Sequence, residues 1–368
     1  MTKRVVVGMS GGVDSSVAAA LLVARGRDVV GVTLRVWPWQ EPEDAPRRFG
    51  SCCSPQTVDD ARQVARRLGI PYYLLNTERE FDRTVIDNFA SEYRAGRTPV
   101  PCVVCNQEVK FGSLLRRARA WEATAVATGH YARVRRDPET GRYLLFRGRD
   151  ARKDQSDFLW PLTQEQLAAA EFPVGDLTKE DVRAQARALG LSVADKPESM
   201  EICFIPDDDY RGFLRRRIPE AFRPGPIVDR AGRRLGEHQG LAAYTVGQRR
   251  GLGLTSDRPL YVLALDPARN AVVVGETEDL ATERLVATAA NFIPFDWPPE
   301  ELRVAAKIRH SHGPAPAVVR ALSGPRPQAA ERRVEVVFDE PQRAVTPGQS
   351  VVFYQDDRVI GGGIISGA

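Results

Sequence analysis

The five cysteines are the most reactive side chains of this 368-residue chain. They stand as an adjacent pair, Cys52-Cys53, as a C-x-x-C stretch from Cys102 to Cys105, and singly at Cys203. An odd number of thiols does not suit a disulfide framework, and the N-terminus lacks a signal-peptide pattern, so we expect a cytoplasmic protein. The thiols are therefore expected to be catalytic, redox-active or metal-binding.

The C-x-x-C stretch is compatible with several chemistries. A zinc knuckle needs a second pair at knuckle spacing, which Cys52-Cys53 does not provide, and the strand-to-helix context of a thioredoxin site is absent. Two interpretations stay open. Thiolates at Cys102, Cys105 and Cys203 could ligate an iron–sulfur cluster with one open iron. Alternatively, one cysteine is a nucleophile and a distant one carries sulfur.

The neighbours of each thiol add a further hint. Cys105 directly precedes a predicted helix over 106–121, and a helix start lowers a thiol pKa, which favours the thiolate. Cys203 lies in the apolar triplet Ile202-Cys203-Phe204, which equally suits a buried structural thiol. Cys52 and Cys53 are structural or unassigned.

A glycine- and serine-rich turn near the N-terminus is a candidate phosphate loop. Ser10-Gly11-Gly12-Val13-Asp14-Ser15-Ser16 follows an apolar strand predicted over 4–9 and opens a helix predicted over 16–25. The glycines let the backbone approach an anion, the serines add hydroxyl donors, and the helix N-terminus supplies oriented N–H groups. The Gly-Lys pair of a Walker A loop is missing. A plain tight turn is the alternative, but the strand-turn-helix setting favours a nucleotide phosphate site.

The surrounding elements predict an α/β fold that places these residues. Strand and helix signals alternate along the first third of the chain, which is typical of a doubly wound parallel sheet covered on both faces. Strands are predicted over 28–36, 71–75 and 123–128, and helices over 55–68, 81–93 and 111–121. His130 follows the last of these strands, where such sheets bind ligands, although a structural histidine is the alternative.

The amino-acid composition changes twice along the chain, which predicts three domains: 1–205, 206–279 and 280–368. The second is rich in Gly, Arg and Pro, with a hairpin near Asp229–Gly232. The third has Val-rich strands separated by Pro and Gly, which predicts a small antiparallel barrel or sandwich. Those strands are predicted over 303–309, 317–322, 333–338, 350–354 and 358–365.

Composition narrows the class of protein. The 43% hydrophobic and 27% charged residues are typical of a globular chain and exclude a disordered or collagen-like one. No apolar run approaches the ~20 residues of a transmembrane helix. The net charge is only +4, but 46 of the 52 basic residues are arginine, whose planar fork suits phosphate. Each arginine cluster alone suits a solvated face; together they fit nucleic-acid phosphates. The clusters are Arg116/Arg117/Arg119, Arg133/Arg135/Arg136, Arg147/Arg149/Arg152, Arg215–Arg217 and Arg249/Arg250.

The order of the motifs resembles one family over almost the whole chain. The loop Ser10–Ser16 is similar to the SGGxDS loop of the PP-loop ATP pyrophosphatases. The motifs that follow it resemble those of the tRNA-specific 2-thiouridylases within that superfamily. These motifs are Thr98-Pro99-x-Pro-Cys-x-x-Cys-Asn106, Phe111-Gly112, Ala127-Thr128-Gly129-His130, Lys153-Asp154-Gln155-Ser156, Ser199-x-x-Ile-Cys203-Phe204, Tyr244-Thr245-x-Gly247-Gln248-Arg249 and Thr346-Pro347-Gly348-Gln349.

The resemblance implies a fold, an activity and a set of site residues. It implies a PP-loop domain, a small central domain and a C-terminal antiparallel β-barrel. It implies adenylation and then sulfur transfer at C2 of the wobble uridine of tRNA, using ATP and Mg²⁺. Cys105 would be the nucleophile and Cys203 the persulfide carrier, and the two could form a disulfide. The ATP site would comprise Gly8, Met9, Ser10, Gly11, Gly12, Val13, Asp14, Ser15, Leu34 and Gly129.

The resemblance also implies RNA contacts and partners. The loop Val100-Pro101-Cys102 would face the target base, and tRNA contacts would come from His130, Lys153, Asp154, Gln155, Arg309, His310 and Gln349. A cysteine desulfurase or a sulfur-carrier protein would supply sulfur, and we expect a monomer. The target base must leave its stack to be reached.

Three positions depart from the usual family pattern. Cys102 stands where many members have Asp, which puts a base role there in doubt and makes a [4Fe-4S] cluster on Cys102, Cys105 and Cys203 a stronger alternative. Leu34 stands where Met is common, and His310 where Tyr is common. A more distant alternative is a PP-loop ligase or amidotransferase acting on a small acid.

Overall fold

The computed structural model describes most of the chain in two compact units, and each unit is described here by itself. The residues described are 3–38, 54–197, 202–205, 207–322, 324, 328 and 331–367. The first unit comprises Met1–Val85, Cys102–Asp209 and Asp357–Val359. The second comprises Ile86–Pro101, Tyr210–Asp356 and Ile360–Ala368. Among the described residues, no helix has the length and apolar character needed to cross a membrane.

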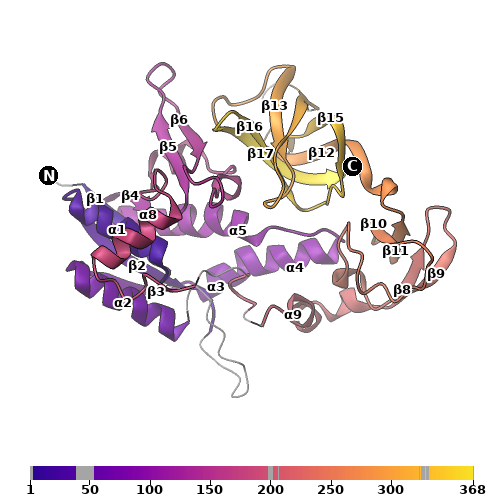
Figure 1. Ribbon diagram of the computed structural model, residues 1–368, viewed down its shortest axis with the longest axis horizontal. Helices are drawn as coiled ribbons and strands as arrows, with labels where there is room; N and C mark the ends of the chain where they lie inside the picture. Colours follow the sequence, from indigo (N-terminus) through magenta and orange to yellow (C-terminus); the bar gives the residue numbers. More distant parts are fainter. Residues whose placement is uncertain are drawn as a thin grey trace. The chain divides into compact units, whose positions relative to one another are not determined.

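A five-stranded parallel sheet forms the centre of the first unit (Figure 1). Its order is β3-β2-β1-β4-β7, so the first strand lies in the middle, as expected for a doubly wound sheet. The central position explains why Val5, Val6 and Val7 are fully buried. The strands are β1 (Arg4–Gly8), β2 (Asp28–Arg35), β3 (Tyr72–Asn76), β4 (Ala123–Ala127) and β7 (Ala170–Glu171).

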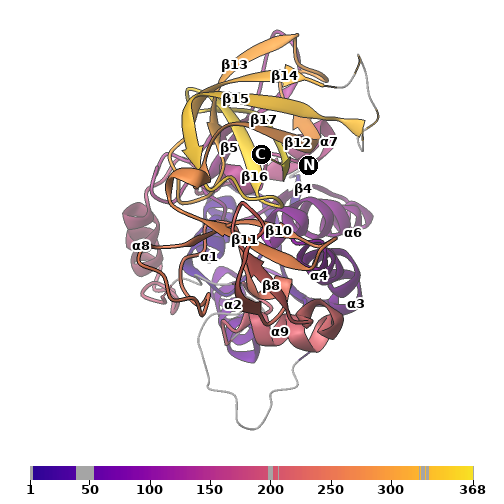
Figure 2. The same ribbon diagram turned by 90° about the vertical axis from the view of Figure 1, so that its right-hand side faces the viewer.

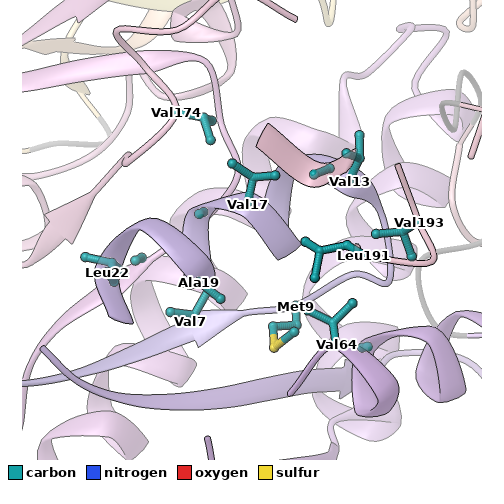
Figure 3. Close-up of a cluster of buried hydrophobic side chains, with 14 of the residues drawn as sticks. Val7, Met9, Val13, Val17, Ala19, Leu22, Val64, Val174, Leu191 and Val193 are labelled. Atoms are coloured by element: carbon teal, nitrogen blue, oxygen red, sulfur yellow. The ribbon is translucent and has the colours of Figure 1, made fainter. Parts of the chain in front are cut away.

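Helices cover both faces of this sheet. Val5 and Val7 pack with α1 (Val13–Ala24), α2 (Pro55–Leu68) and α8 (Lys179–Ala188) in one apolar cluster, part of which is shown in Figure 3. The opposite face is covered by α6 (Leu114–Ala120), which packs against β4. The predicted doubly wound parallel sheet is confirmed.

The helix α2 shows why local signals worked well in this part of the chain. Ser54 accepts a hydrogen bond from the Thr57 N–H, Pro55 occupies the first turn, and Gly69 ends the helix with a left-handed φ of 67°. These are the start and stop features expected of a helix. The predicted range 55–68 is confirmed.

Two helical stretches contain π-helical turns that the sequence did not reveal. The first runs through α3 (Glu78–Phe81), a π segment (Asp82–Ile86) and α4 (Asp87–Arg94). The second runs through α5 (Pro101–Val104), a π segment (Cys105–Ser113) and α6. The predicted helix over 106–121 therefore begins five residues earlier, at Pro101, because a proline suits the first helical turn.

The first unit also contains a hairpin that was not predicted. Strands β5 (Ala132–Arg136) and β6 (Tyr143–Arg147) pair antiparallel, and β6 also pairs with Arg358 and Val359. The arginines of β5 obscure its apolar alternation, so the segment resembles a charged loop. The remaining short elements of this unit are a 3-10 turn (Ser156–Phe158) and α7 (Gln164–Ala168).

The second unit contains a four-stranded sheet in the order β10-β11-β8-β9. The predicted hairpin near Asp229–Gly232 is confirmed, because the Asp229 carboxylate accepts the N–H groups of Ala231 and Arg233 in the turn between β8 and β9. The elements are α9 (Tyr210–Arg217), a 3-10 turn (Pro219–Phe222), β8 (Gly225–Val228), β9 (Arg234–His238), a 3-10 turn (Leu241–Ala243), β10 (Tyr261–Asp266), β11 (Ala271–Gly275) and a 3-10 turn (Glu278–Leu280).

Six antiparallel strands then close into a barrel, visible in both ribbon views (Figures 1 and 2). The order is β12-β15-β14-β13-β16-β17, and pairing of β12 with β17 closes it around an apolar core. The predicted barrel is confirmed, but its longest strand, β12, was missed because polar residues and register shifts interrupt its alternation. The strands are β12 (Ala281–Phe292), β13 (Glu301–Lys307), β14 (Ala315–Ala321), β15 (Val334–Arg343), β16 (Ser350–Gln355) and β17 (Arg358–Gly367).

His238 makes the stability of the second unit depend on pH. This fully buried ring donates from Nε2 to the Asn270 carbonyl (2.9 Å) and accepts the Gly240 N–H at Nδ1 (3.0 Å). Burial lowers the pKa of His238 from its ordinary value of 6.5. As pH falls below that value, the unfolded chain binds a proton that the folded protein resists, so folding stability is lost.

We therefore expect wild-type protein to lose up to about 1.4 kcal/mol of unfolding free energy through His238 between pH 7.5 and 5.5. The His238→Gln variant should be less stable at pH 7.5 and should lose less on acidification. Urea unfolding at the two pH values measures both losses. Equal losses in wild type and variant would show that His238 does not titrate in this way.

Candidate nucleotide and thiol site

The glycine- and serine-rich turn lies between the end of β1 and the first turn of α1. The helix begins at Val13, three residues earlier than predicted, so Asp14 and Ser15 belong to its first turn. Gly12 is the N-cap and makes no side-chain capping bond, which leaves the first N–H groups of the helix directed toward the loop. Ser16 Oγ donates to the Gly12 carbonyl (2.8 Å), and Ser10 remains exposed.

Two glycines permit close approaches at this site. Gly11 has φ +70°, and a Cβ there would lie 2.1 Å from the Thr57 carbonyl oxygen of α2. Gly129 follows β4, and a Cβ there would lie 2.5 Å from the Ser15 backbone nitrogen. A larger residue at either position would push the loop away from its neighbours. Gly129 therefore lies directly against the start of α1.

The structure brings the predicted ATP residues together at the carboxyl ends of three neighbouring strands. Gly8–Ser15 follows β1, the half-buried Leu34 lies near the end of β2, and Gly129 follows β4. The turn after β1 is tied to β2, because the Met9 N–H donates to the Val32 carbonyl (2.8 Å). A helix N-terminus with an adjacent strand edge suits the phosphates and base of a nucleotide.

A buried lysine that the sequence did not single out neutralises the acidic residue of the loop. Lys179 Nζ donates to both oxygens of Asp14 (2.7 and 2.8 Å), and the Tyr131 hydroxyl donates to Asp14 Oδ1 (2.7 Å). The Lys179 side chain is only 9% exposed. The backbone N–H of Lys179 donates to Oδ2 of the buried Asp150 (3.0 Å). Asp14 therefore does not present an uncompensated negative charge to a polyphosphate.

A second lysine contacts the loop backbone itself. Lys196 Nζ donates to the Gly11 carbonyl (3.0 Å) and to Asp60 Oδ2 (2.5 Å), and both side chains are largely buried. The chain contains six lysines. Two of them contact the phosphate loop, although they lie 165 and 185 residues further along the chain than their partners. In the sequence, the rarity of lysine is the only signal that could have pointed to Lys179 and Lys196.

Two of the three described thiols, Cys102 and Cys105, lie in the helical stretch that begins at Pro101. Cys102 is exposed in α5, and Cys105 and Cys203 are partly exposed. Cys105 is not at a helix start, because α5 precedes it, so the predicted helix start directly after Cys105 is wrong. Cys102 lies in the first turn instead.

Asn106 fixes the helical turn that carries Cys105. Its side chain is buried, Nδ2 donates to the Phe158 carbonyl (3.1 Å), and Oδ1 accepts from Lys110 Nζ (3.0 Å). These contacts hold the backbone next to Cys105 against a separate loop of the first unit. Asn106 therefore fixes the position of the backbone that carries the Cys105 thiol.

The described residues do not form a metal site from these thiols. Within the described part of the chain, no three His, Cys, Asp or Glu side chains are close enough to hold a metal ion, and this includes Cys102, Cys105 and Cys203. The described thiols thus give no support to a three-cysteine iron–sulfur cluster, which stays an untested alternative. Cys52, Cys53 and Ser199 lie outside the described residues.

His130 is held as a neutral ring beside the phosphate loop. Its Nδ1 lies 2.6 Å from Thr128 Oγ1, and the ring packs between Phe111 and Phe172. Burial and the nearby Lys110 ammonium lower the pKa of His130 well below its ordinary value. The ring can stack or form hydrogen bonds, but it does not offer a positive charge to phosphate.

Several of the residues assigned to tRNA by resemblance have structural contacts. The buried Asp154 accepts the N–H groups of Gly148 and Ser156 (both 3.1 Å), and Gln155 Oε1 accepts the Tyr131 N–H (3.1 Å). Lys153 is partly exposed in the same loop of the first unit. Asp154 and Gln155 therefore shape the loop that presents Lys153.

The other assigned residues belong to the second unit. Arg309 donates to the carbonyls of Arg343 and Ala344, and His310 is exposed beside it. Gln349 Nε2 donates to the Thr98 carbonyl (2.7 Å). Val100 is partly exposed, whereas Pro101 is buried.

Many arginines of the predicted basic clusters form ion pairs, which reduces the positive charge available to RNA. Arg117 and Arg119 pair with Glu80 and Glu165, at 3.1 and 2.6 Å. Arg133 pairs with Asp357 and Arg217 with Asp87. Exposed pairs of this kind contribute little to stability and can exchange partners. Arg135, Arg136, Arg249 and Arg250 are exposed.

Family models match nearly the whole chain in sequence order. They are described as a tRNA methyl transferase HUP domain (residues 3–207), a tRNA methyl transferase PRC-barrel domain (211–276) and an aminomethyltransferase beta-barrel domain (282–365).

Curated relatives share about half of the sequence. A protein of Heliobacterium modesticaldum named tRNA-specific 2-thiouridylase MnmA is 52% identical over 366 residues, covering 99% of this chain and 93% of the relative. A protein of the same name from Moorella thermoacetica is 53% identical over 361 residues, covering 98% of each. A solved 4-thiouridine synthetase–RNA complex with bound ATP matches with a TM-score of 0.34 and 18% identity, over 59% of this chain and 51% of that one.

The ion pair beneath the phosphate loop generates a stability prediction. Lys179→Met should lower the free energy of unfolding by about 2 kcal/mol, because it leaves a partly buried carboxylate without its cation. Adding Asp14→Asn should recover part of this loss, whereas the exposed Lys3→Met should change stability by less than about 0.5 kcal/mol. Urea unfolding followed by circular dichroism measures these values. A Lys179→Met variant as stable as Lys3→Met would contradict the assigned role.

Proposed function

The chain belongs to the tRNA-specific 2-thiouridylase family, and we propose that it catalyses ATP-dependent 2-thiolation of the wobble uridine of tRNA. The observation that carries this proposal is a nucleotide-type phosphate loop in the same compact unit as two partly exposed cysteines, Cys105 and Cys203. A ligase acting on a small acid would need the loop but not the thiols. No second function is favoured by a specific contact.

In the first proposed step, ATP adenylates the uridine. The C2 carbonyl oxygen attacks the α-phosphorus, and pyrophosphate leaves with the electron pair of the broken P–O bond. The helix N-terminus after Gly12 and the hydroxyl of Ser10 would hold the phosphates, Leu34 would pack against adenine, and Gly129 would allow the nucleotide close to the loop. Mg²⁺ would be held largely through phosphate oxygens, as is usual for this ion.

In the second proposed step, sulfur replaces the activated oxygen. The terminal sulfur of a Cys203 persulfide attacks C2, and AMP leaves with the former carbonyl oxygen. The Cys105 thiolate then attacks the Cys203 sulfur and breaks the persulfide S–S bond. The electron pair of that bond stays on the transferred sulfur, and a Cys105–Cys203 disulfide remains. An external thiol must reduce this disulfide before the next turnover.

The persulfide route is favoured over a cluster because the described thiols do not gather as metal ligands. No step is therefore assigned to a [4Fe-4S] cluster. A cysteine desulfurase or a sulfur-carrier protein would supply the sulfane sulfur to Cys203.

We further propose where RNA binds and how the chain is organised. Val100, Pro101 and Cys102 would face the target base, while His130, Lys153, Asp154, Gln155, Arg309, His310 and Gln349 would serve tRNA binding directly or by shaping the contact loops. The chain would act in the cytoplasm as a monomer of three domains, 1–205, 206–279 and 280–368.

The activity predicts a specific pattern of cysteine variants. With tRNA, ATP, Mg²⁺ and a persulfide donor, wild-type protein should form 2-thiouridine, detected by mass spectrometry of digested tRNA. Cys105→Ser and Cys203→Ser should lower the rate by at least about 100-fold, because each removes a reacting sulfur. Both variants should still release pyrophosphate in a tRNA-dependent manner.

Cys52→Ser serves as the control for loss of a thiol and should retain the activity. Failure of wild-type protein to form 2-thiouridine, or full activity of both Cys105→Ser and Cys203→Ser, would refute the proposed function.

The choice between the two sulfur chemistries is tested by metal content. Aerobically purified, iron-free protein should thiolate tRNA at the same rate as protein reconstituted anaerobically with iron and sulfide. Iron and acid-labile sulfide assays accompany the rate measurements. Activity that appears only after reconstitution would favour the cluster and overturn the persulfide route.

A further inference from the structure

Thr98 is a junction of three segments that lie far apart in the sequence. Its N–H donates to the Pro347 carbonyl (2.8 Å), and its carbonyl accepts from Gln349 Nε2 (2.7 Å). Its hydroxyl lies 3.3 Å from Thr245 Oγ1. All of these residues belong to the second unit. Both backbone polar groups and the side chain of Thr98 therefore have specific partners.

The backbone at Gly348 lies too close to Thr98 for any side chain. Gly348 has φ +91°, and a Cβ there would lie 2.7 Å from the Thr98 nitrogen and 2.9 Å from its oxygen. Only glycine allows this approach and adopts this φ without strain. The backbones of Gly348 and Thr98 are thus in direct van der Waals contact.

The barrel side of the junction is itself anchored. The Gly348 N–H donates to the Ile365 carbonyl, and the Ile365 N–H donates to the Gln349 carbonyl, each at 2.8 Å. These bonds tie the turn that contains Gln349 to β17. Gln349 therefore presents its amide from a rigid base.

The Thr245 side of the junction is anchored to the four-stranded sheet. The Thr245 N–H donates to Gln248 Oε1 (3.2 Å), and the Val262 N–H of β10 donates to the Gln248 carbonyl (2.9 Å). The Gly247 N–H donates back to the Val262 carbonyl (2.8 Å). The four-stranded sheet and the barrel of the second unit thus converge on one residue.

The segment that follows Thr98 has little conformational freedom of its own. Pro99 and Pro101 have fixed φ angles and lack N–H donors, and both are buried. Arg97, just before the junction, is held by a two-point contact with Glu92 (2.7 and 2.5 Å). The position of Thr98 therefore sets the backbone path of Pro99-Val100-Pro101, which leads directly into α5.

We propose that Gln349 is a positioning residue that holds the Thr98 carbonyl and thereby sets the loop Pro99-Val100-Pro101. This inference rests on the proposed function, because that loop is the one proposed to face the target base. It assigns to Gln349 a role within the protein, because one Nε2–H is donated to the Thr98 carbonyl, rather than direct contact with RNA. The Thr346–Gln349 motif then supports the reaction by holding Thr98, which lies about 250 residues earlier in the sequence.

Amide exchange tests the contact without any RNA. Gln349→Leu keeps a similar volume but removes the donor, so amides of residues 97–102 should exchange roughly tenfold faster in the free protein. The matched control is Gln355→Leu, which removes a similar bond, from Nε2 to the Arg303 carbonyl (3.0 Å), elsewhere in the barrel. This control should leave exchange of residues 97–102 unchanged. Unchanged exchange in Gln349→Leu would overturn the proposal whatever its activity.

Kinetics separate positioning from RNA contact. Gln349→Leu should lower kcat for thiolation roughly tenfold and change the KM for tRNA by less than about twofold, because a misplaced loop affects reaction rather than affinity. Gln355→Leu should match wild type in both constants. A raised KM with unchanged kcat and exchange would mean that Gln349 contacts RNA and that the proposal is wrong. Wild-type protein that forms no 2-thiouridine would instead refute the proposed function.

Discussion

A loop that receives a polyphosphate cannot carry an uncompensated negative charge, and Asp14 places one in the first turn of α1. The buried ammonium of Lys179 neutralises it, with the Tyr131 hydroxyl as a second donor. Lys179 comes from the first turn of α8, which packs on α1. The phosphate loop therefore depends on α8 of the first unit. The loop has no lysine of its own, and the fold brings two to it.

The same part of the first unit links the phosphate loop to the thiols. Lys196 holds the Gly11 carbonyl and lies seven residues before Cys203 in the chain. Cys105 lies in a helical stretch that Asn106 anchors to the Phe158 carbonyl. The residues proposed for phosphate binding and for sulfur transfer thus lie in a single compact unit. That arrangement suits a reaction in which the activated oxygen must persist until sulfur replaces it.

Local signals predicted the elements whose start and end are written in a few neighbouring residues. The helix α2 has its cap at Ser54, Pro55 in its first turn and Gly69 at its end, so its range was predicted correctly. The apolar runs of β1, β2 and β4 were equally clear. Prediction failed where side-chain types conflict with backbone structure, as in the arginine-rich β5 and the interrupted β12. It also failed at Cys105, because a short helical turn precedes the residue and a π segment begins there.

The sequence by itself determined which reactive residues the protein has and in what order: a phosphate loop, a C-x-x-C stretch, an isolated cysteine and the motifs that follow. Those features are local, and their chemistry depends on residue type. Only the tertiary structure decided that Lys179 pairs with Asp14, that Gln349 holds Thr98, and that three candidate thiols do not gather as metal ligands. Apart from the short separation of Cys102 and Cys105, these facts depend on distances between residues more than 90 positions apart in the chain, and packing of whole elements sets such distances.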